Sequence, residues 1–369
     1  MERIKVIEYI SNLGDGGAET LVKDYVRLLD RNRFEPVVVV LRGGINSANK
    51  RTIEENKIPI IEIFPHWNIF VRVWKKMFGR WYIPYRLRRI IAKENASVLH
   101  MHLMVLQHIP YIGKQLNALR LLFTCHSVPE AVFGGDRTKE KNAADYLVKY
   151  YGLQLIALHR DMADELNQLF GVENTAVVRN GIDFCKFRNL QISCAEERRA
   201  LGIPENVFAI GHVGSFFKVK NHPFLVETFI EVAKRRDDAY LLMVGAGDSS
   251  AVEKQLRDNG LGDRYMILSH RTDVNEILRA MDVFVFPSLY EGLPLALIEA
   301  QVSGLRCIVS DAVPPEAFRS ERVIALSLEN PKKWADTILN DSVTGVSYGD
   351  LEDYDMNKEI KYLETLYLQ

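Results

Sequence analysis

The chain has 369 residues, of which 47% are hydrophobic and 26% are charged. This length exceeds one ordinary hydrophobic core and suits two domains. The 47 basic and 48 acidic residues nearly cancel, so no net charge favours nucleic acid as a partner. No apolar run approaches the roughly 18 residues of a membrane span, the opening MERIKVIEYI lacks the apolar h-region of a signal peptide, and the four cysteines show no metal-type spacing. We therefore expect an enzyme-sized protein of the reducing cytoplasm.

Short β-branched runs alternate with longer segments of helical period, a pattern that predicts βα units and parallel sheets. In the first half, strands are expected at 4–10, 36–41, 58–63, 97–102, 119–126, 153–158 and 175–180. A polar stretch then interrupts the series. The second half repeats the pattern, with strands expected at 207–215, 239–247, 265–270, 282–288 and 306–311. The predicted fold class is α/β, with two doubly wound Rossmann-like domains that face each other across a cleft.

Each half places glycines where a strand turns into a helix. In NLGDGGAETLVKDYV, Gly14, Gly16 and Gly17 follow the first strand, so backbone amides could approach an anion at a helix N-terminus. A tight βα turn explains the same glycines. In GHVGSFFKVKNHPFL, Lys218 and Lys220 precede a helix, where they oppose the helix dipole unless an anion binds there. A solvated basic loop is the alternative.

Two carboxylates stand in the apolar stretch PSLYEGLPLALIEAQVSG, residues 287–304. Glu291 is expected in the loop after a buried strand, and Glu299 about a turn and a half into the following helix. Both positions reach the crevice where open α/β sheets bind ligands. A ligand rich in hydroxyl groups would satisfy two such acids, although Glu299 could instead pair with a basic neighbour.

Several motifs together resemble glycosyltransferase family 4, whose members are retaining enzymes of the GT-B fold. The resemblance covers nearly the whole chain. It rests on GGAE at 16–19, the His126 of TCHS, NGID at 180–183, VGSFFKVKNH at 213–222, LMVGAGD at 242–248 and the spacing of Glu291 and Glu299. The sequence from FPSLYEGLPLALIEAQVSG through SDAVPPE is similar to that of bacterial exopolysaccharide and capsule enzymes.

The resemblance implies transfer of a sugar from a nucleotide-sugar donor, which we expect to be a UDP-sugar, to a glycan or a polyprenyl-diphosphate-linked acceptor. By family pattern, Lys220 would neutralise the leaving diphosphate, Glu291 would hold the donor sugar, and His126 would lie near the transferred sugar. These three form the predicted catalytic set. The predicted donor-binding residues are Gly16, Gly17, Ser215, Lys218, Gly292, Leu293 and Glu299, the last of which would accept the ribose hydroxyls. The resemblance implies no protein nucleophile, and the donor phosphate would act as the base.

One residue departs from the family pattern. Where most members read Gly-Arg, this chain reads Gly214-Ser215, so one of two phosphate-binding cations is missing. Lys218 could replace that charge. Otherwise the protein would be a catalytically weak partner subunit that binds nucleotide sugar. A sugar-nucleotide epimerase or hydrolase of the same fold is a third possibility, but it needs a water-handling acid pair that the sequence does not display.

The C-terminal end contains the triplet DYD at 353–355, which matches the Asp-x-Asp of metal-dependent transferases. It lies beyond the last expected strand, and Asp355 suits a helix N-cap. We therefore expect no metal and no cofactor. The resemblance implies that a terminal helix, 355–369, packs back on the first domain. The expected domains are then residues 1–183, on the acceptor side, and residues 184–354, which would bind the nucleotide sugar.

The segment 66–93 contains eight Lys or Arg and no acid. Trp67, Trp74 and Trp81 recur every seven residues, which allows them to share one face of a helix. Basic, aromatic and amphipathic character is typical of a helix that lies at a membrane interface. An aromatic core helix with a solvated basic face is the alternative. We expect peripheral attachment through this segment to an anionic membrane, at the inner face of the cell membrane.

Overall fold

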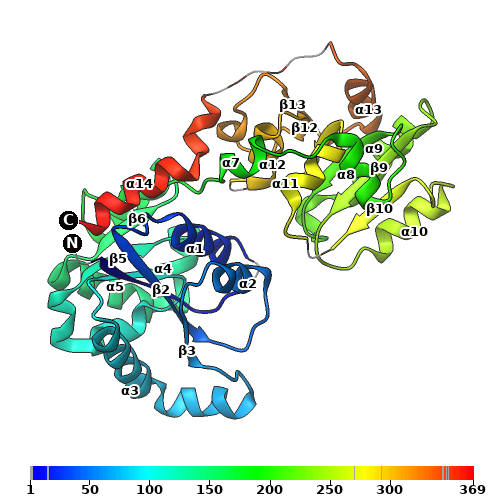
Figure 1. The fold of residues 1–369 in the computed structure, drawn as a ribbon. Helices are drawn as coiled ribbons and strands as arrows, with labels where there is room; N and C mark the ends of the chain where they lie inside the picture. The colour runs from blue at the N-terminus through cyan, green and yellow to red at the C-terminus, as the bar shows by residue number, and fades with distance from the viewer. Residues whose placement is uncertain are drawn as a thin grey trace. The chain divides into compact units, whose positions relative to one another are not determined.

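A computed structural model describes residues 3–14, 16–269, 271–291, 293–342, 345, 347 and 349–369. The chain divides into two compact units, Met1–Asn180 with Met356–Gln369, and Gly181–Asp355, each shown in Figure 1. The sequence placed the domain boundary after residue 183. Each unit is a parallel sheet with helices on both faces, the doubly wound arrangement that the alternating pattern predicts;.

The first unit contains a seven-stranded sheet of order β3-β2-β1-β4-β5-β6-β7. Its strands are β1 (Ile4–Ile10), β2 (Phe34–Arg42), β3 (Ile60–Phe64), β4 (Val98–His102), β5 (Arg120–Thr124), β6 (Gln154–Ala157) and β7 (Ala176–Val177). Its helices are α1 (Gly17–Leu28), α2 (Ala48–Glu55), α3 (Ile69–Glu94), α4 (Pro129–Phe133), α5 (Thr138–Tyr151), α6 (Arg160–Phe170) and α14 (Met356–Tyr367), with 3₁₀ segments η1 (Leu106–Ala118) and η2 (Gly135–Arg137).

Strand alternation sorts the side chains of the first sheet onto two faces. One face packs against α1 and the C-terminal helix α14, through residues such as Val6, Leu122 and Leu363. The other face packs against α3, η1 and α5, through residues such as Ile7, Leu99 and Leu147. The C-terminal helix is thus part of the first core, although it follows the second unit in the chain.

The second unit contains a six-stranded sheet of order β10-β9-β8-β11-β12-β13. Its strands are β8 (Phe208–Val213), β9 (Ala239–Val244), β10 (Tyr265–Leu268), β11 (Val283–Phe286), β12 (Arg306–Ser310) and β13 (Val323–Leu326). Its helices are α7 (Phe184–Arg188), α8 (Cys194–Leu201), α9 (His222–Ala233), α10 (Ser250–Asp258), α11 (Val274–Ile277), α12 (Leu295–Val302) and α13 (Pro331–Leu339), with 3₁₀ segments η3 (Lys218–Lys220), η4 (Leu278–Ala280), η5 (Pro315–Ala317) and η6 (Leu351–Tyr354).

The expected strands all form; β1 has the expected bounds, β2 extends beyond its apolar run at both ends, and most of the others are shorter than their runs. Two differences concern whole features. Strand β13 was not predicted, because its four-residue run VIAL is short and carries no strong turn signal before it. Trp67 lies before the N-cap Asn68 of α3, where it packs on Phe64 with ring centroids 6.0 Å apart. The expectation that Trp67 shares a helical face with the other two tryptophans is therefore wrong.

Candidate functional site

The second unit has a reversal of strand order between β8 and β11. From β8 the chain proceeds outward to β9 and β10, and then returns to β11 on the other side of β8 before continuing to β12 and β13. The strands β8 and β11 pair in parallel, with Phe284 opposite Gly211. Loops that leave such neighbouring strands in opposite directions open a crevice at the carboxyl ends, which is where open α/β sheets bind ligands.

Lys220 and Glu291 meet at this crevice. Lys220 ends η3, the turn after β8, and Glu291 lies in the loop after β11. Lys220 Nζ donates a hydrogen bond to Glu291 Oε1 at 2.6 Å, and the two side chains are 18% and 13% exposed. The two loops are also joined through the backbone, because Leu289 N donates to Val219 O at 2.8 Å. The structure therefore brings together two of the three predicted catalytic residues.

Aromatic packing fixes the position of the Lys220 ammonium. Its Nζ lies 4.9 Å from the centroid of the Phe286 ring, and Phe286 is fully buried at the end of β11. A cation over a ring face is attracted by the ring quadrupole. The stem of Lys220 thus packs along the protein while its charge remains at the edge of the sheet, where an anionic ligand can reach it.

The loop that carries Ser215 lies against the loop after β9. Gly214 N donates to Val244 O at 2.8 Å and Phe216 N donates to Ala246 O at 2.8 Å. The backbones approach so closely that a Cβ on Gly245 would lie 2.0 Å from Gly214 O, so this position requires glycine.

The described residues among the other predicted donor-binding positions of the second unit follow β8 and β11. Ser215 is partly buried, whereas Lys218 is exposed and forms no ion pair with any carboxylate of the described residues. Leu293 and Glu299 are partly buried, and Glu299 is the fifth residue of α12, whose N-cap is Pro294. Gly292 lies outside the described residues.

Two buried imidazoles lie behind Lys220 and were not identified from the sequence. His212 in β8 and His222 at the start of α9 are 0% and 3% exposed, respectively, with ring centroids 4.9 Å apart. Burial lowers the pKa of His212 to about 3 and that of His222 to about 4. Both rings are therefore neutral near pH 7. They add no charge to the crevice, where the ammonium of Lys220 is held by Glu291.

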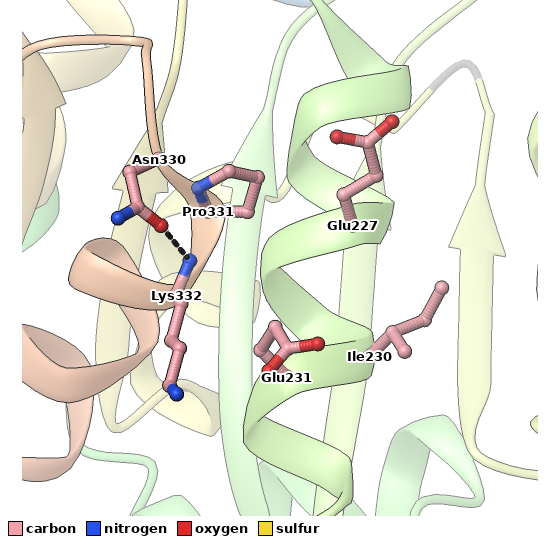
Figure 2. Close-up of a pocket in the computed structure, with 6 residues that line it drawn as sticks. All are labelled: Glu227, Ile230, Glu231, Asn330, Pro331 and Lys332. Carbon is pink, nitrogen blue, oxygen red and sulfur yellow. Dashed lines mark hydrogen bonds between the residues drawn. The ribbon is translucent and has the colours of Figure 1, made fainter.

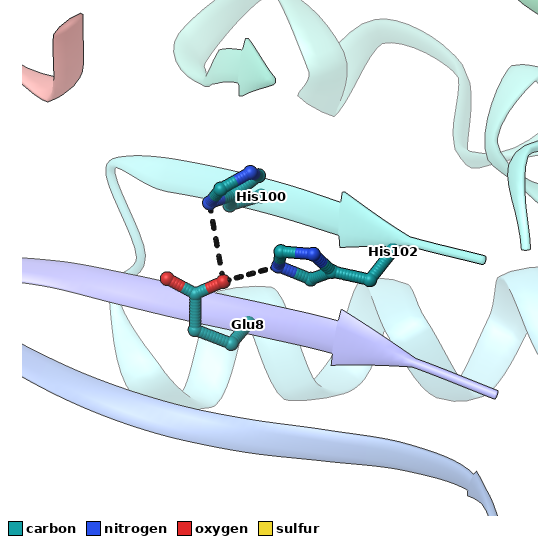
Figure 3. A group of neighbouring side chains, drawn as sticks. All are labelled: Glu8, His100 and His102. Atoms are coloured by element: carbon teal, nitrogen blue, oxygen red, sulfur yellow. Dashed lines mark hydrogen bonds and ion pairs between the residues drawn. The ribbon is translucent and has the colours of Figure 1, made fainter. Parts of the chain in front are cut away.

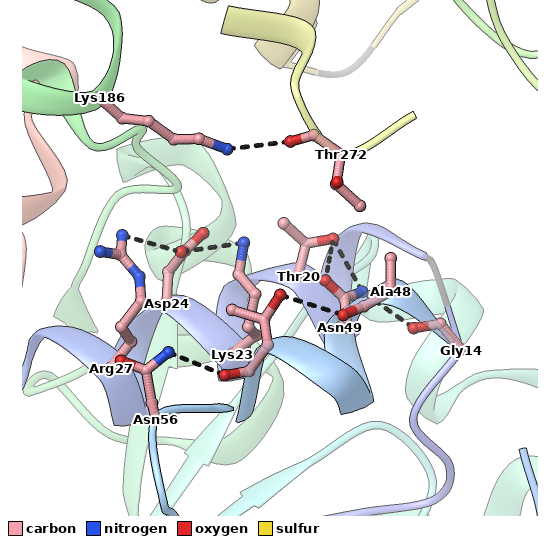
Figure 4. Close-up of polar contacts among 11 residues, drawn as sticks. Gly14, Thr20, Lys23, Asp24, Arg27, Ala48, Asn49, Asn56, Lys186 and Thr272 are labelled. Atoms are coloured by element: carbon pink, nitrogen blue, oxygen red, sulfur yellow. Dashed lines mark hydrogen bonds and ion pairs between the residues drawn. The ribbon is translucent and has the colours of Figure 1, made fainter. Parts of the chain in front are cut away.

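The first unit has the same kind of reversal between β1 and β4. The glycine loop leaves β1 there, and α1 begins at Gly17 with Gly16 as its N-cap. Side chains of α2 and of its N-cap residue Ser47 hold the start of this loop: Asn49 Nδ2 donates to Gly14 O at 2.9 Å (Figure 4), and Ser47 Oγ donates to Leu13 O at 2.7 Å. Gly14 thus lies at the carboxyl end of β1, held by a hydrogen bond from Asn49, and Gly16 and Gly17 lie at the start of α1.

His126 follows β5 and is joined to a set of buried polar side chains on the same face of the sheet. The set consists of Glu8 in β1, His100 and His102 in β4, Thr124 in β5 and Tyr367 in α14, each 0–3% exposed. His126 Nε2 lies 2.9 Å from His102 Nδ1. Only His126 was predicted; the signal for the others was a polar residue at alternate positions of the apolar strands VIEYI, VLHMH and LFTCH.

Glu8, His100 and His102 have ligand atoms within 4.8 Å of one another, close enough to share a metal ion. Figure 3 shows both imidazoles directed at the Glu8 carboxylate. His102 Nε2 lies 2.7 Å from Glu8 Oε2, while His100 lies between Tyr367 and Thr124, with both contacts at 2.8 Å. Because each of these ring nitrogens faces a protein hydrogen-bond partner, the group fits a hydrogen-bond network better than a metal centre.

A surface hollow in the second unit lies apart from these residues. It is lined by residues of α9 and of the start of α13, where Lys332 N donates to Asn330 Oδ1 at 3.0 Å (Figure 2). It contains none of the predicted site residues.

The matches to known protein families correspond to the two units of the chain. Residues 15–184 match the family described as Glycosyltransferase Family 4, and residues 207–340 match the family described as Glycosyl transferases group 1.

Three curated relatives are similar over much or all of the chain. The putative glycosyltransferase EpsF of Bacillus subtilis is 28% identical over 92% of this chain and 88% of its own length. The capsular polysaccharide biosynthesis glycosyltransferase CapH of Staphylococcus aureus is 24% identical over 99% of both. The Escherichia coli UDP-Gal:alpha-D-GlcNAc-diphosphoundecaprenol alpha-1,3-galactosyltransferase is 28% identical over 61% of this chain and 60% of its own length.

Among solved structures, HepE of Anabaena in complex with UDP superposes with a TM-score of 0.73. It covers 99% of this chain and 100% of its own, at 17% identity. At that identity the likeness concerns the fold.

No helix among the described residues is long and apolar enough to cross a membrane.

Proposed function

We propose that this chain, which belongs to glycosyltransferase family 4, takes its sugar from a UDP-sugar, since members of that family use nucleotide sugars. It transfers the sugar with retention of configuration to a lipid-diphosphate-linked glycan. The choice of donor is supported by the UDP bound to HepE and by the UDP-Gal named for the E. coli relative. The choice of acceptor is supported by the diphosphoundecaprenol named for that relative. The CapH resemblance supports a role in cell-surface polysaccharide synthesis.

The observation that carries this proposal is the Lys220–Glu291 pair at the strand reversal of the second unit. As the glycosidic bond breaks, negative charge grows on the leaving diphosphate, and a fixed cation there stabilises the transition state. Lys220 supplies that cation. Glu291 orients Lys220 and accepts hydroxyl hydrogen bonds from the donor sugar, while Glu299 on α12 accepts the ribose hydroxyls.

The proposed reaction uses no metal ion. The leaving diphosphate meets Lys220 and the backbone amides at the start of α12 instead of a divalent cation. Asp355, the last residue of the DYD triplet, directly precedes α14, the position of an N-cap. Turnover is expected to be unchanged in EDTA. Loss of turnover in EDTA that manganese restores would contradict this part of the proposal.

A nucleotide-sugar-binding subunit with little activity is a second candidate function, and the observation that favours it is Ser215 in place of the family's arginine. Donor consumption separates the candidates. A transferase consumes UDP-sugar only with an acceptor, a hydrolase consumes it without one, and a binding subunit consumes none. In a thermal-shift screen we expect the largest stabilisation from UDP or a UDP-sugar, about 2.7 kcal/mol at a hundred times the dissociation constant. A screen in which only GDP compounds or no nucleotide stabilised the fold would contradict the choice of donor.

The first half of α3 presents apolar side chains to solvent. From Ile69 to Phe78 no residue is buried, although Val71 packs against the core and the Trp74 ring lies 6.1 Å from that of Phe64; the buried residues of the helix begin at Gly79. Phe70 is 80% exposed and Trp81 is 69% exposed. The other exposed apolar residues of this helix are Ile69, Val73, Trp74, Met77, Phe78 and Tyr85. A run of this kind marks an interaction surface.

Basic residues border this apolar surface. Arg72, Lys76 and Arg80 are exposed and Lys75 is half-buried, with its ammonium 5.6 Å from the ring centroid of Trp67. Aromatic side chains suit the headgroup layer of a bilayer, and each cation near an anionic leaflet contributes about 1 kcal/mol. We therefore include in the proposal that α3 attaches the enzyme to the inner face of the cell membrane, where a lipid-linked acceptor would lie.

Sedimentation with liposomes tests the attachment. The wild-type protein is expected to sediment with anionic vesicles at low salt and less so at high salt. Changing Arg72, Lys75, Lys76 and Arg80 to Glu should abolish sedimentation without affecting UDP binding. A control in which Lys139, Lys332, Lys333 and Lys361, all exposed, become Glu has the same net charge and should still sediment. A wild-type protein that stays in the supernatant at low salt contradicts the attachment.

A further inference from the structure

A chain of hydrogen bonds runs from a buried carboxylate to His126. Glu8 Oε2 lies 2.7 Å from His102 Nε2, and His102 Nδ1 lies 2.9 Å from His126 Nε2. The register of the sheet creates this arrangement, because Glu8 in β1 is paired with His100 in β4 and alternate residues of one strand share a face. Figure 3 shows the first of these contacts.

Glu8 acts as a hydrogen-bond acceptor in this series of contacts. Its carboxylate is fully buried and also accepts a hydrogen bond from the Tyr367 hydroxyl, at Oε1, over 2.7 Å. Burial by itself favours the protonated acid, but the attraction of His100 and the hydrogen bonds from His100 and His102 outweigh it and hold the pKa of Glu8 below its usual value. An ionised carboxylate has no proton to donate.

The proton positions on the two imidazoles follow from that carboxylate. His102 must donate from Nε2, and burial lowers its pKa to about 4, so the ring is neutral near pH 7 and its Nδ1 carries only a lone pair. His126 must then donate from Nε2 to that lone pair. Burial also holds the pKa of His126 well below its usual value, so the second nitrogen of His126, Nδ1, is an acceptor.

We propose that Glu8, acting through His102, fixes the proton of His126 on Nε2, so that His126 offers an acceptor to a hydroxyl group of the substrate. Glu8 and His102 are positioning residues in this scheme, since neither is placed against substrate. The consequence for sugar transfer rests on the proposed function. The proton arrangement itself rests only on the contacts of Glu8, His102 and His126.

The opposite arrangement needs a donor at position 8. If residue 8 offered an N–H to His102 Nε2, His102 could carry its own proton on Nδ1 and donate to His126, whose proton would then move to Nδ1. Glu8→Gln has nearly the same shape as the native residue and supplies such a donor. It therefore allows the proton of His126 to occupy either ring nitrogen, without removing side-chain volume from the core.

The test is nitrogen NMR of the full-length protein labelled in its histidines, with the His126 signals assigned by their loss in His126→Ala. The wild-type protein should show His126 in one form, protonated at Nε2. Glu8→Gln should show a second form, protonated at Nδ1, and its turnover should fall about tenfold with little change in donor KM, the rate equivalent of one hydrogen bond.

Glu140→Gln is the matched control. Glu140 is another buried glutamate of the first unit, 3% exposed, which accepts from Gln107 Nε2 at 2.8 Å and lies outside the hydrogen-bond chain. It should leave both the His126 signals and turnover unchanged. His102→Phe is a second variant, which keeps Glu8 and removes the acceptor that His126 Nε2 needs, and it should also yield mixed proton positions.

A single Nε2-protonated form of His126 in both Glu8→Gln and His102→Phe would overturn the proposal. The proposal would also be overturned if the second form appeared with no change in turnover, because turnover would then not depend on which nitrogen of His126 carries the proton. A wild-type protein that transfers no sugar would refute the proposed function instead, and the NMR comparison would still decide whether Glu8 fixes the proton.

Discussion

Removing the charges of the Lys220–Glu291 pair should damage catalysis more than folding. The substitutions Lys220→Met and Glu291→Gln keep approximate size and remove charge. The bond between the pair is 2.6 Å long and its side chains are 18% and 13% exposed, so each single change leaves one charged group partly buried without its partner. A hydrogen bond between charged groups contributes about 1.5–3 kcal/mol, and partial exposure places the expected loss of stability near the lower end of that range.

The expected loss of turnover is at least about a hundredfold for either single variant, equivalent to about 2.7 kcal/mol of transition-state stabilisation. Because Glu291 holds Lys220 in place, the two should act as one unit. The double variant should then lose little more turnover than the worse single variant. Lys220→Ala and Glu291→Ala should show losses of at least the same size.

The assay is the initial rate of UDP release with donor and acceptor, together with urea denaturation of each variant. Lys234→Met with Glu231→Gln is a matched control, because this pair is also a lysine–glutamate pair in the second unit but its lysine is 62% exposed. The control should keep wild-type turnover. Single variants of the Lys220–Glu291 pair with wild-type turnover would refute the reasoning, as would losses that multiply in the double variant.

Three other outcomes are expected. Glu299→Ala should raise the donor KM with a smaller effect on kcat, as measured by initial rates, because its proposed contact is with the ribose; a loss confined to kcat would contradict that role. Lys218→Ala should lower turnover about as much as Lys220→Ala if Lys218 supplies the charge that Ser215 lacks, whereas wild-type rates would assign Lys218 to the solvated surface. The free energy of unfolding should fall as pH drops below about 6.5. The buried rings of His212 and His222 have pKa values of about 3 and about 4, so between pH 6.5 and pH 4 they bind protons mainly after unfolding. Each ring then contributes a slope of up to about 1.4 kcal/mol per pH unit. His222→Asn should reduce that slope in urea denaturation at pH 7, 6 and 5, and an unchanged slope would contradict the assignment.

The fold could be predicted from the sequence where one physical signal dominated. The strand AYLLMV at Ala239–Val244 is buried on both faces, and buried parallel strands appear as continuous apolar runs bounded by turns. Strand β13 escaped notice because an edge strand of four residues has too short a run to show a period;. Trp67 was misplaced because seven-residue spacing cannot show where a helix begins, which the cap at Asn68 decides;.

The candidate site could be predicted only in part. Lys220 and Glu291 were identified from motif spacing, but their direct contact depends on how two loops 71 residues apart fold over neighbouring strands. Glu8 and Tyr367 are separated by 359 residues, and no local pattern relates them. Their contact follows from sheet register and from the return of α14 to the first core, and both are tertiary features.

The most direct test of the central claim is UDP release from a UDP-sugar by the purified wild-type protein and by Lys220→Ala, with and without a polyprenyl-diphosphate-linked sugar. Acceptor-dependent release by the wild-type protein, reduced at least about a hundredfold in the variant, is the predicted result. Acceptor-dependent release that the variant retains at the wild-type rate, or no release by the wild-type protein from any UDP-sugar, would contradict it.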